Sequence, residues 1–220
     1  MPLDKHQVAN LDTAIVQYAF PPVYFDFEAA TQVRAIHMRE VERAIRAMLV
    51  SSIVQDVRNG LANIIYWGYA QVGFRDFRVR RFQEGVTLDH LTRFQSLVAV
   101  HGVPSLSQVR ALGIPEYSGM SFISKILMFL DPAEYCVLDR QLAKLGAVPG
   151  ERALHGLLFG TQIPVTAHNE AVYDAWRADC RRISTQYFGG GYRVVDVERG
   201  FFQLVQSARL VLAQRIYAAA

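Results

Sequence analysis

The segment Gly119–Leu145, GMSFISKILMFLDPAEYCVLDRQLAKL, constrains the fold of this chain more than any other stretch. It opens with glycine and serine, continues as an apolar run and is interrupted by a proline. This order predicts a buried helix over Ser121–Leu130, a loop around Pro132 and a further helix over Asp139–Leu145. A carboxylate at Asp139 would stand at a helix start, where free N–H groups and the helix dipole stabilise its charged form.

Helical periodicity recurs along the rest of the chain. Apolar residues spaced by three and four predict helices over Ala29–Val57 up to a break at Gly60, and over Leu61–Val72, Thr87–His101, Ser105–Gly113, Asn169–Tyr187 and Val197–Ala220. Side chains that can cap a helix precede three of them, namely Thr87, Ser105 and Asp196. One strand is expected at Val23–Phe27, and Asn63–Tyr69 could be strand instead of helix. The pattern therefore predicts an all-α fold of packed helices.

Composition limits the class of protein. The chain has 220 residues, of which 51% are hydrophobic and 20% charged, enough for one domain of two lobes or for two small domains. No apolar run of about eighteen residues predicts a membrane span. The first residues, MPLDKHQVANLD, lack the layout of a signal peptide, so a cytoplasmic location is expected. Two cysteines and six scattered histidines predict no disulfide framework, metal site or cofactor.

One stretch of the chain is both basic and aromatic. Four arginines alternate with phenylalanines between Phe74 and Phe82, namely Arg75, Arg78, Arg80 and Arg81. Arginines among aromatic rings are typical of a surface that follows phosphates and stacks on bases. A solvated helix or loop whose phenylalanines point into the core fits the same pattern, and the sequence leaves both readings open.

Within the first segment, SKILMFLDPAEYCVLD resembles the core of the helix–hairpin–helix DNA glycosylases. Among these it looks most like the small bacterial proteins described as having an 8-oxoguanine glycosylase fold. In that family the catalytic aspartate follows the last hairpin glycine by about twenty residues, as Asp139 follows Gly119. The resemblance implies a first helix at Ser105–Leu112, a hairpin at Gly113–Met120 and a second helix at Ser121–Leu130. The stretch RVVDVERGFFQLV is similar to the closing helix of the family.

The resemblance carries an expected architecture. The whole chain would form one glycosylase-like unit of two packed helical lobes with a cleft. One lobe would comprise residues 1–80 and 150–220, and the other, residues 81–149, would carry the helix–hairpin–helix. The cysteines that hold an iron–sulfur cluster in some members are missing, so no cluster is expected.

The resemblance also implies an activity. The protein would flip a modified or oxidised base such as 8-oxoguanine out of double-stranded DNA and excise it, acting as a monomer associated with the nucleoid. Asp139 and Lys125 would be catalytic. The DNA would be bound by Gly119, Ser121, Arg75, Arg78, Arg80, Arg81 and Arg140. Aromatic rings suited to line a base pocket are Tyr66, Trp67, Phe122 and Tyr187.

The chain departs from the family pattern at the nucleophile. The usual Leu-Pro-Gly-Val-Gly hairpin is absent, and Gly113 and Gly119 stand six residues apart. Ser121 occupies the position of the lysine nucleophile. Lys125 lies one turn further on the same helix face, from which a long side chain could reach back over that turn toward Asp139. A solvated lysine at the edge of the core is the alternative. With lysine as nucleophile the enzyme would also cleave the strand, and with water it would only release the base.

Two other kinds of protein fit the same sequence. The first is a catalytically inert helical module that binds DNA or another protein and has kept a glycosylase-like fold. The long hairpin and the displaced lysine favour this alternative, whereas the retained Asp139 opposes it. The second is an unrelated helical interaction protein in which Asp139 only caps a helix.

Overall fold

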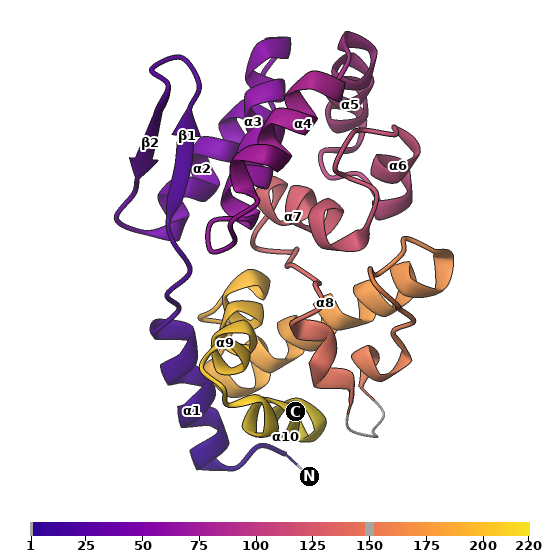
Figure 1. Cartoon of the computed structure of the whole chain (residues 1–220). Coiled ribbons are helices and arrows are strands. Elements are labelled where there is room, and N and C mark those ends of the chain that lie inside the picture. Colours follow the sequence, from indigo (N-terminus) through magenta and orange to yellow (C-terminus); the bar gives the residue numbers. More distant parts are fainter. Residues whose placement is uncertain (1, 148–151) are drawn as a thin grey trace. The chain divides into compact units, whose positions relative to one another are not determined.

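The structure, a computed structural model, describes residues 2–147 and 152–220 and is mostly helical (Figure 1). The chain divides into two compact units. Phe20–Asp131 forms the first, called here the continuous unit. Met1–Ala19 and Pro132–Ala220 together form the second, called here the discontinuous unit. Among the described residues, no helix is long and apolar enough to cross a membrane.

The continuous unit is built around one central helix. Its elements are β1 (Val23–Asp26), β2 (Thr31–Arg34), α2 (Met38–Leu49), α3 (Val54–Gly68), α4 (Arg75–Gly85), α5 (Leu88–His101), α6 (Leu106–Ala111) and α7 (Met120–Leu130). Helix α3 packs against α2, α4, α5, α7 and β1. Its residues from Gly60 to Trp67 are all buried, as expected of a helix that is apolar on every side.

The discontinuous unit joins the two ends of the chain. Its elements are α1 (Lys5–Val16), the 3₁₀ helices η1 (Leu142–Ala147) and η2 (Ala153–Gly156), and the helices α8 (Ala167–Phe188), α9 (Val194–Gln206) and α10 (Leu210–Ala219). Helices α1 and α9 lie side by side. A Cβ atom at Gly200 of α9 would come within 2.6 Å of Ile15 Cγ1, so glycine lets the two helices approach closely.

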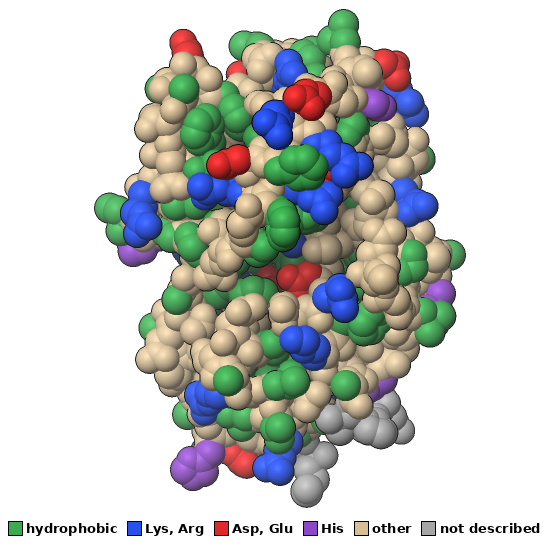
Figure 2. All heavy atoms as spheres, viewed as in Figure 1, with side chains coloured by type: hydrophobic (Ala, Val, Ile, Leu, Met, Phe, Trp, Pro, Cys, Tyr) green, Lys and Arg blue, Asp and Glu red, His purple; other side chains and the backbone are tan. Residues whose placement is uncertain are grey.

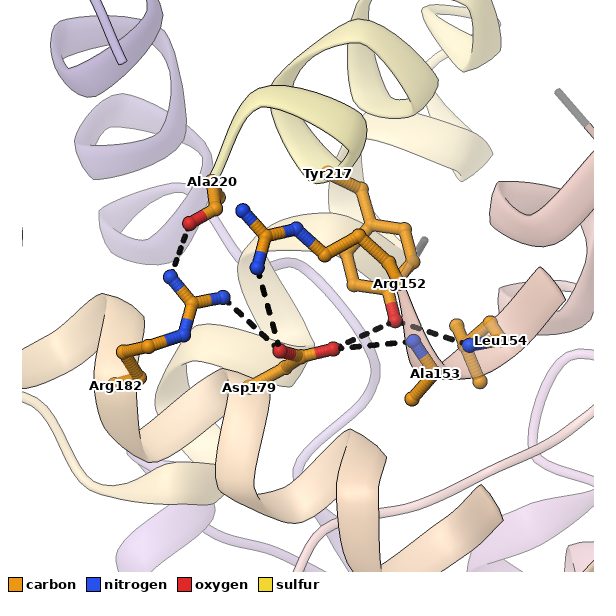
Figure 3. A network of polar contacts seen from close by, with 7 residues as sticks. All are labelled: Arg152, Ala153, Leu154, Asp179, Arg182, Tyr217 and Ala220. Carbon is orange, nitrogen blue, oxygen red and sulfur yellow. Dashed lines mark hydrogen bonds and ion pairs between the residues drawn. The ribbon is translucent and has the colours of Figure 1, made fainter. Parts of the chain in front are cut away.

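A half-buried carboxylate ties three elements of this unit together (Figure 3). The Asp179 carboxylate of α8 pairs with Arg182 at 2.9 Å and with Arg152, next to η2, at 3.9 Å. It also accepts a hydrogen bond of 2.9 Å from the Tyr217 hydroxyl of α10. That hydroxyl in turn accepts a bond of 3.1 Å from the backbone N–H of Leu154. Because charge-assisted bonds are strong, the network fixes η2 and α10 on α8.

Several elements agree with the sequence prediction. The predicted strand at Val23–Phe27 is β1, and Asn63–Tyr69 is helical rather than extended. The side chains of Thr87 and Ser105 cap α5 and α6 by accepting from the N–H groups of His90 and Gln108. The α4 segment, which the sequence left open between helix and loop, is a helix.

Other predicted boundaries are wrong. The helix predicted over Ala29–Val57 begins only at α2, because Thr31–Arg34 pairs with β1 in the antiparallel register Val23↔Arg34. Gly60 lies inside α3 instead of ending a helix. A Cβ there would meet Met48 Cβ at 2.9 Å, so this glycine serves the close packing of α2 on α3.

The C-terminal part also differs from the prediction. The helix predicted over Val197–Ala220 is divided into α9 and α10, with Ala208 in the left-handed region at φ 59° between them. Asp196 is the third residue of α9 and not its cap. Its carboxylate accepts from the N–H of Arg193 at 3.1 Å.

The division of the chain also has other bounds than the sequence indicated. The boundaries between the lobes were predicted at residues 80/81 and 149/150. The boundaries between the two units lie at residues 19/20 and 131/132.

Candidate functional site

The continuous unit forms a helix, a loop and a second helix where the sequence predicted a hairpin. The loop between α6 and α7 contains two residues in the left-handed region, Gly113 at φ 68° and Glu116 at φ 71°. It is anchored by the buried Tyr117, whose hydroxyl donates to the Leu61 carbonyl of α3 at 2.5 Å. Gly119 then caps α7 with extended backbone. The loop therefore presents the start of α7 in a fixed position.

Lys125 folds back over one turn of α7. Its Nζ donates to the Ser121 carbonyl oxygen at 2.9 Å and lies 3.2 Å from the Ser121 hydroxyl. The sequence predicted a reach back over this turn toward Asp139, whereas both of these contacts are to Ser121. The residue is only 6% exposed, so the alternative of a solvated surface lysine is wrong. The amine thus lies beside Ser121, at the position where the resemblance places the family's nucleophile.

An aromatic pair lies next to this amine. Lys125 Nζ is 5.0 Å from the centroid of the Phe122 ring, and Phe122 stacks on Tyr69 at 5.0 Å and 27°. The guanidinium of Arg78 lies 5.8 Å from the centroid of the Tyr69 ring. Burial raises the pKa of Tyr69, Arg78 lowers it and Glu116 raises it. Two neutral rings are therefore flanked by two basic side chains, an arrangement that cation–π attraction stabilises.

The arginines of α4 form a basic and aromatic face. Figure 2 shows basic and hydrophobic side chains intermixed where Figure 1 places α4. Arg75 lies over the Tyr66 ring at 4.1 Å. Arg78 and Arg81 both pair with Glu116, at 3.0 and 3.1 Å, and the Glu116 side chain is only 7% exposed. One buried carboxylate therefore holds two of the predicted DNA-binding arginines in place.

The phenylalanines of this stretch differ in burial, so some fit the predicted stacking surface and one fits the predicted core position. Phe82 is fully buried in the core, whereas Phe74 and Phe77 are 63% and 50% exposed. Arg80 is also exposed and lies 4.0 Å from the surface carboxylate of Glu84. Two exposed rings next to arginines are consistent with a surface that binds nucleic acid.

The four rings predicted to line a base pocket have different surroundings. Tyr66 is 5% exposed and donates its hydroxyl to Gln32 at 2.8 Å. Trp67 is 3% exposed and packs edge-on against Phe20 and Phe129. Both are core residues. Tyr187 belongs to the discontinuous unit, where its hydroxyl accepts from the N–H of Leu3. Phe122 is the ring that contacts Lys125.

In the discontinuous unit, Asp139 caps a short 3₁₀ helix. Its Oδ1 accepts from the backbone N–H groups of Gln141 at 2.9 Å and Leu142 at 3.1 Å. These bonds form a tight turn, after which η1 begins, so the α-helix predicted over Asp139–Leu145 is wrong. Both bonds use Oδ1, and the side chain is half-buried. The predicted cap is present, and a cap of this kind does not exclude a catalytic role.

The backbone that leads to Asp139 is clamped to α8. The Tyr173 hydroxyl donates to the Cys136 carbonyl at 2.7 Å, and the indole N–H of Trp176 donates to the Val137 carbonyl at 3.2 Å. Both rings are buried, with exposures of 1% and 0%. Asp139 lies two residues beyond this clamp, so its position depends on α8.

Charged and phenolic groups gather near Asp139. Burial raises the pKa of Tyr18, Arg199 lowers it, and Glu198 and Asp139 raise it further, so the phenol stays protonated at neutral pH. The Arg199 guanidinium lies 5.2 Å from the centroid of the Tyr18 ring. Glu198 and Arg199 of α9 are 3% and 4% exposed. Asp139 thus lies in the neighbourhood of a tyrosine that can donate a hydrogen bond.

Sequence reasoning missed Tyr18, Tyr69, Glu198 and Arg199. The sequence does indicate the charged pair in α9, because Glu198-Arg199 interrupts the apolar run VVDVERGFF. The sequence gives no such indication for Tyr18 and Tyr69, since tyrosines in apolar stretches are usually core residues. The last predicted DNA-binding residue, Arg140, is exposed and donates to the Thr161 carbonyl at 3.2 Å.

Comparison of the chain with protein-family models, curated proteins and solved structures finds no match.

Proposed function

We propose that this protein is a DNA N-glycosylase that excises a modified or oxidised base such as 8-oxoguanine, with Lys125 as its nucleophile. The observation that carries the proposal is the position of the Lys125 amine. It is buried, it lies beside Ser121 and it is flanked by a half-buried aromatic ring. A lysine on a mere surface helix would extend into solvent instead.

The contacts of the continuous unit support a site for DNA. The first N–H groups of α7 can bind a phosphate, because helix N-termini attract anions. The arginines of α4 each pair with a carboxylate in this structure, and phosphates would bind by competing with these carboxylates. The exposed Phe74 and Phe77 supply stacking surfaces. The target base would leave the stack and enter the site next to Phe122.

The proposed reaction uses the neutral amine of Lys125. Its lone pair attacks C1′ of the sugar while the bond from C1′ to the base nitrogen breaks, and the base leaves with the bonding electrons and takes up a proton. Loss of the proton from nitrogen and opening of the sugar ring give a Schiff base. Loss of a proton from C2′ to water then forms a C2′–C3′ double bond, and the 3′ phosphate leaves with the electrons of its bond to C3′. The resemblance assigns a second catalytic role, stabilisation of the positive charge that develops on the sugar, to the Asp139 carboxylate of the discontinuous unit.

The proposal is tested with duplexes that each carry one modified base, 8-oxoguanine first, incubated with and without borohydride. We expect base release and a covalent complex with borohydride, which reduces the Schiff base. Lys125→Gln should abolish the complex. Lys144→Gln is the matched control, because Lys144 is an exposed lysine whose amine donates to Gln141 at the surface.

Two results separate the proposal from its alternatives. Base release without a trapped complex would make water the nucleophile and Lys125 a bystander. Binding of duplex DNA without release from any member of the panel would make the protein an inert DNA-binding module.

A further inference from the structure

The end of α3 lies directly against the Lys125 site. Gly68 is the last residue of α3, and a Cβ atom built on it would come within 2.8 Å of Phe122 Cε1 and 3.1 Å of Phe122 Cζ. The same atom would lie 3.4 Å from Lys125 Cδ. Carbon atoms in ordinary contact are about 3.5 to 4.0 Å apart, so only glycine fits here without a shift of the ring.

Position 68 is glycine because a larger residue lacks space there, and not because the backbone conformation requires it. Gly68 is part of a regular helix and is not one of the residues with positive φ. Glycine is a poor helix former, and alanine would be favoured at this position on propensity alone. What glycine provides is close approach of the Phe122 ring and of the lysine stem to the α3 backbone.

We propose that Gly68 is a positioning residue for the Lys125 amine. Its bare Cα lets Phe122 lie flat on Tyr69, and the ring then supports the amine beside Ser121. A side chain at this position would displace the ring and crowd the lysine stem, and so would move the amine off Ser121. The inference rests on the proposed function in one respect, namely that the placed amine is the nucleophile.

The test compares Gly68→Ala with Gly73→Ala, because a Cβ at Gly73 meets nothing within 4 Å. Borohydride trapping is measured in a single turnover at saturating 8-oxoguanine duplex. We expect Gly68→Ala to slow trapping by about tenfold or more, as small displacements of a reacting group do, with DNA affinity and melting temperature close to those of the wild type. Gly73→Ala should leave all three unchanged.

A double-mutant cycle shows whether the effect passes through the ring. Phe122→Leu shortens the side chain that the new methyl group would meet. Adding Gly68→Ala to Phe122→Leu should therefore reduce the trapping rate far less than adding it to the wild type. An equal reduction in both backgrounds would overturn the proposed route through Phe122.

A second measurement does not depend on DNA. Formaldehyde with borohydride methylates accessible lysines, and peptide mass spectrometry gives the rate at Lys125. We expect Gly68→Ala to raise this rate several-fold while Lys144 reacts as before. An unchanged rate at Lys125 would overturn the inference. A raised rate in a protein that excises no base would sustain the inference and refute the proposed function.

Discussion

The two units hold their candidate catalytic side chains in opposite ways. Lys125 stands in a regular helix, and its amine is held by Ser121, four residues earlier in the same helix. Asp139 stands in an irregular segment that is clamped by Tyr173 and Trp176, whose partners are 37 and 39 residues away in the sequence. The lysine amine is hydrogen-bonded within its own helix, with α3 packed against its stem, whereas the backbone before the aspartate is held by hydrogen bonds from α8.

This difference predicts different sensitivities. A helix of good formers keeps its side-chain spacing when distant contacts change. An irregular segment has no repeating hydrogen bonds of its own, so it keeps its path only while its tertiary partners remain. The position of Asp139 should therefore respond to loss of the hydrogen bonds from α8, whereas that of Lys125 should respond to changes in the packing of α3 on α7.

The largest effect is expected from Asp139→Asn. The amide oxygen can still accept from the N–H groups of Gln141 and Leu142, so the cap and the fold should persist. The charge is lost, and base release in a single turnover should fall by roughly two to four orders of magnitude. Asp174→Asn, which removes a surface carboxylate from the same unit, is the control. Activity equal to that of the wild type would leave Asp139 as a cap only.

A smaller loss is expected when the clamp on α8 is opened. Trp176→Phe removes the bond to the Val137 carbonyl and keeps most of the buried ring. Because catalysis is sensitive to small displacements, kcat should fall roughly tenfold with KM little changed. The free energy of unfolding should fall by about 1 kcal/mol or somewhat more. If kcat stays constant while stability falls, the clamp is structural and does not position Asp139.

Glu116→Gln tests the basic face of the continuous unit. The buried Glu116 carboxylate pairs with Arg78 and Arg81, and its removal leaves both guanidinium charges available to phosphates. Affinity for duplex DNA should rise several-fold at low salt. The plot of log affinity against log salt should steepen by roughly 0.9 for each further phosphate that the protein neutralises. Glu84→Gln, at an exposed pair, should change little. Weaker binding by Glu116→Gln would show that the carboxylate orients these arginines for DNA.

The smallest effect concerns the discontinuous unit alone. The Tyr192 hydroxyl donates to Asp12 at 2.6 Å, and this bond, with burial, raises the pKa of Tyr192 from 10.0 to about 12. A pKa that is higher in the folded state stabilises the fold below about pH 10, and the gain is lost as the pH rises through about 12. Because the group is partly exposed, we expect about 1 kcal/mol. At about pH 8, the free energy of unfolding should be lower for Tyr192→Phe than for the wild type. This difference should shrink above about pH 11.

Sequence reasoning succeeded where local patterns decide the structure. The caps at Thr87 and Ser105 and the helix from Met120 to Leu130 are local features, and the placement of Lys125 and Ser121 on one helix face follows from helix geometry. Each depends on residues only a few positions apart, which one sequence displays.

Sequence reasoning failed where the structure depends on contacts between residues that are far apart in the sequence. The pairing of Thr31–Arg34 with β1 overrides the helical pattern that precedes α2. The 3₁₀ turn after Asp139 and the clamp by α8 need contacts that no periodicity reveals. Gly60 was predicted to break a helix, yet it serves close packing inside one, as Gly68 and Gly200 do inside or at the end of theirs. Spacing alone cannot distinguish these two uses of glycine.

The discontinuity of one unit bears on the order in which the protein folds during synthesis. The ribosome completes Phe20–Asp131 first, and this unit with its lysine has all its partners by then. Helix α1 emerges earlier still, but its apolar face must wait for α9, which begins at Val194. The chain is synthesised at about 5 to 20 residues per second, so α1 remains without α9 for roughly ten seconds or more. The discontinuous unit, which holds Asp139, is therefore assembled after the continuous unit, and its α1 and α9 pack together only once α9 has been made.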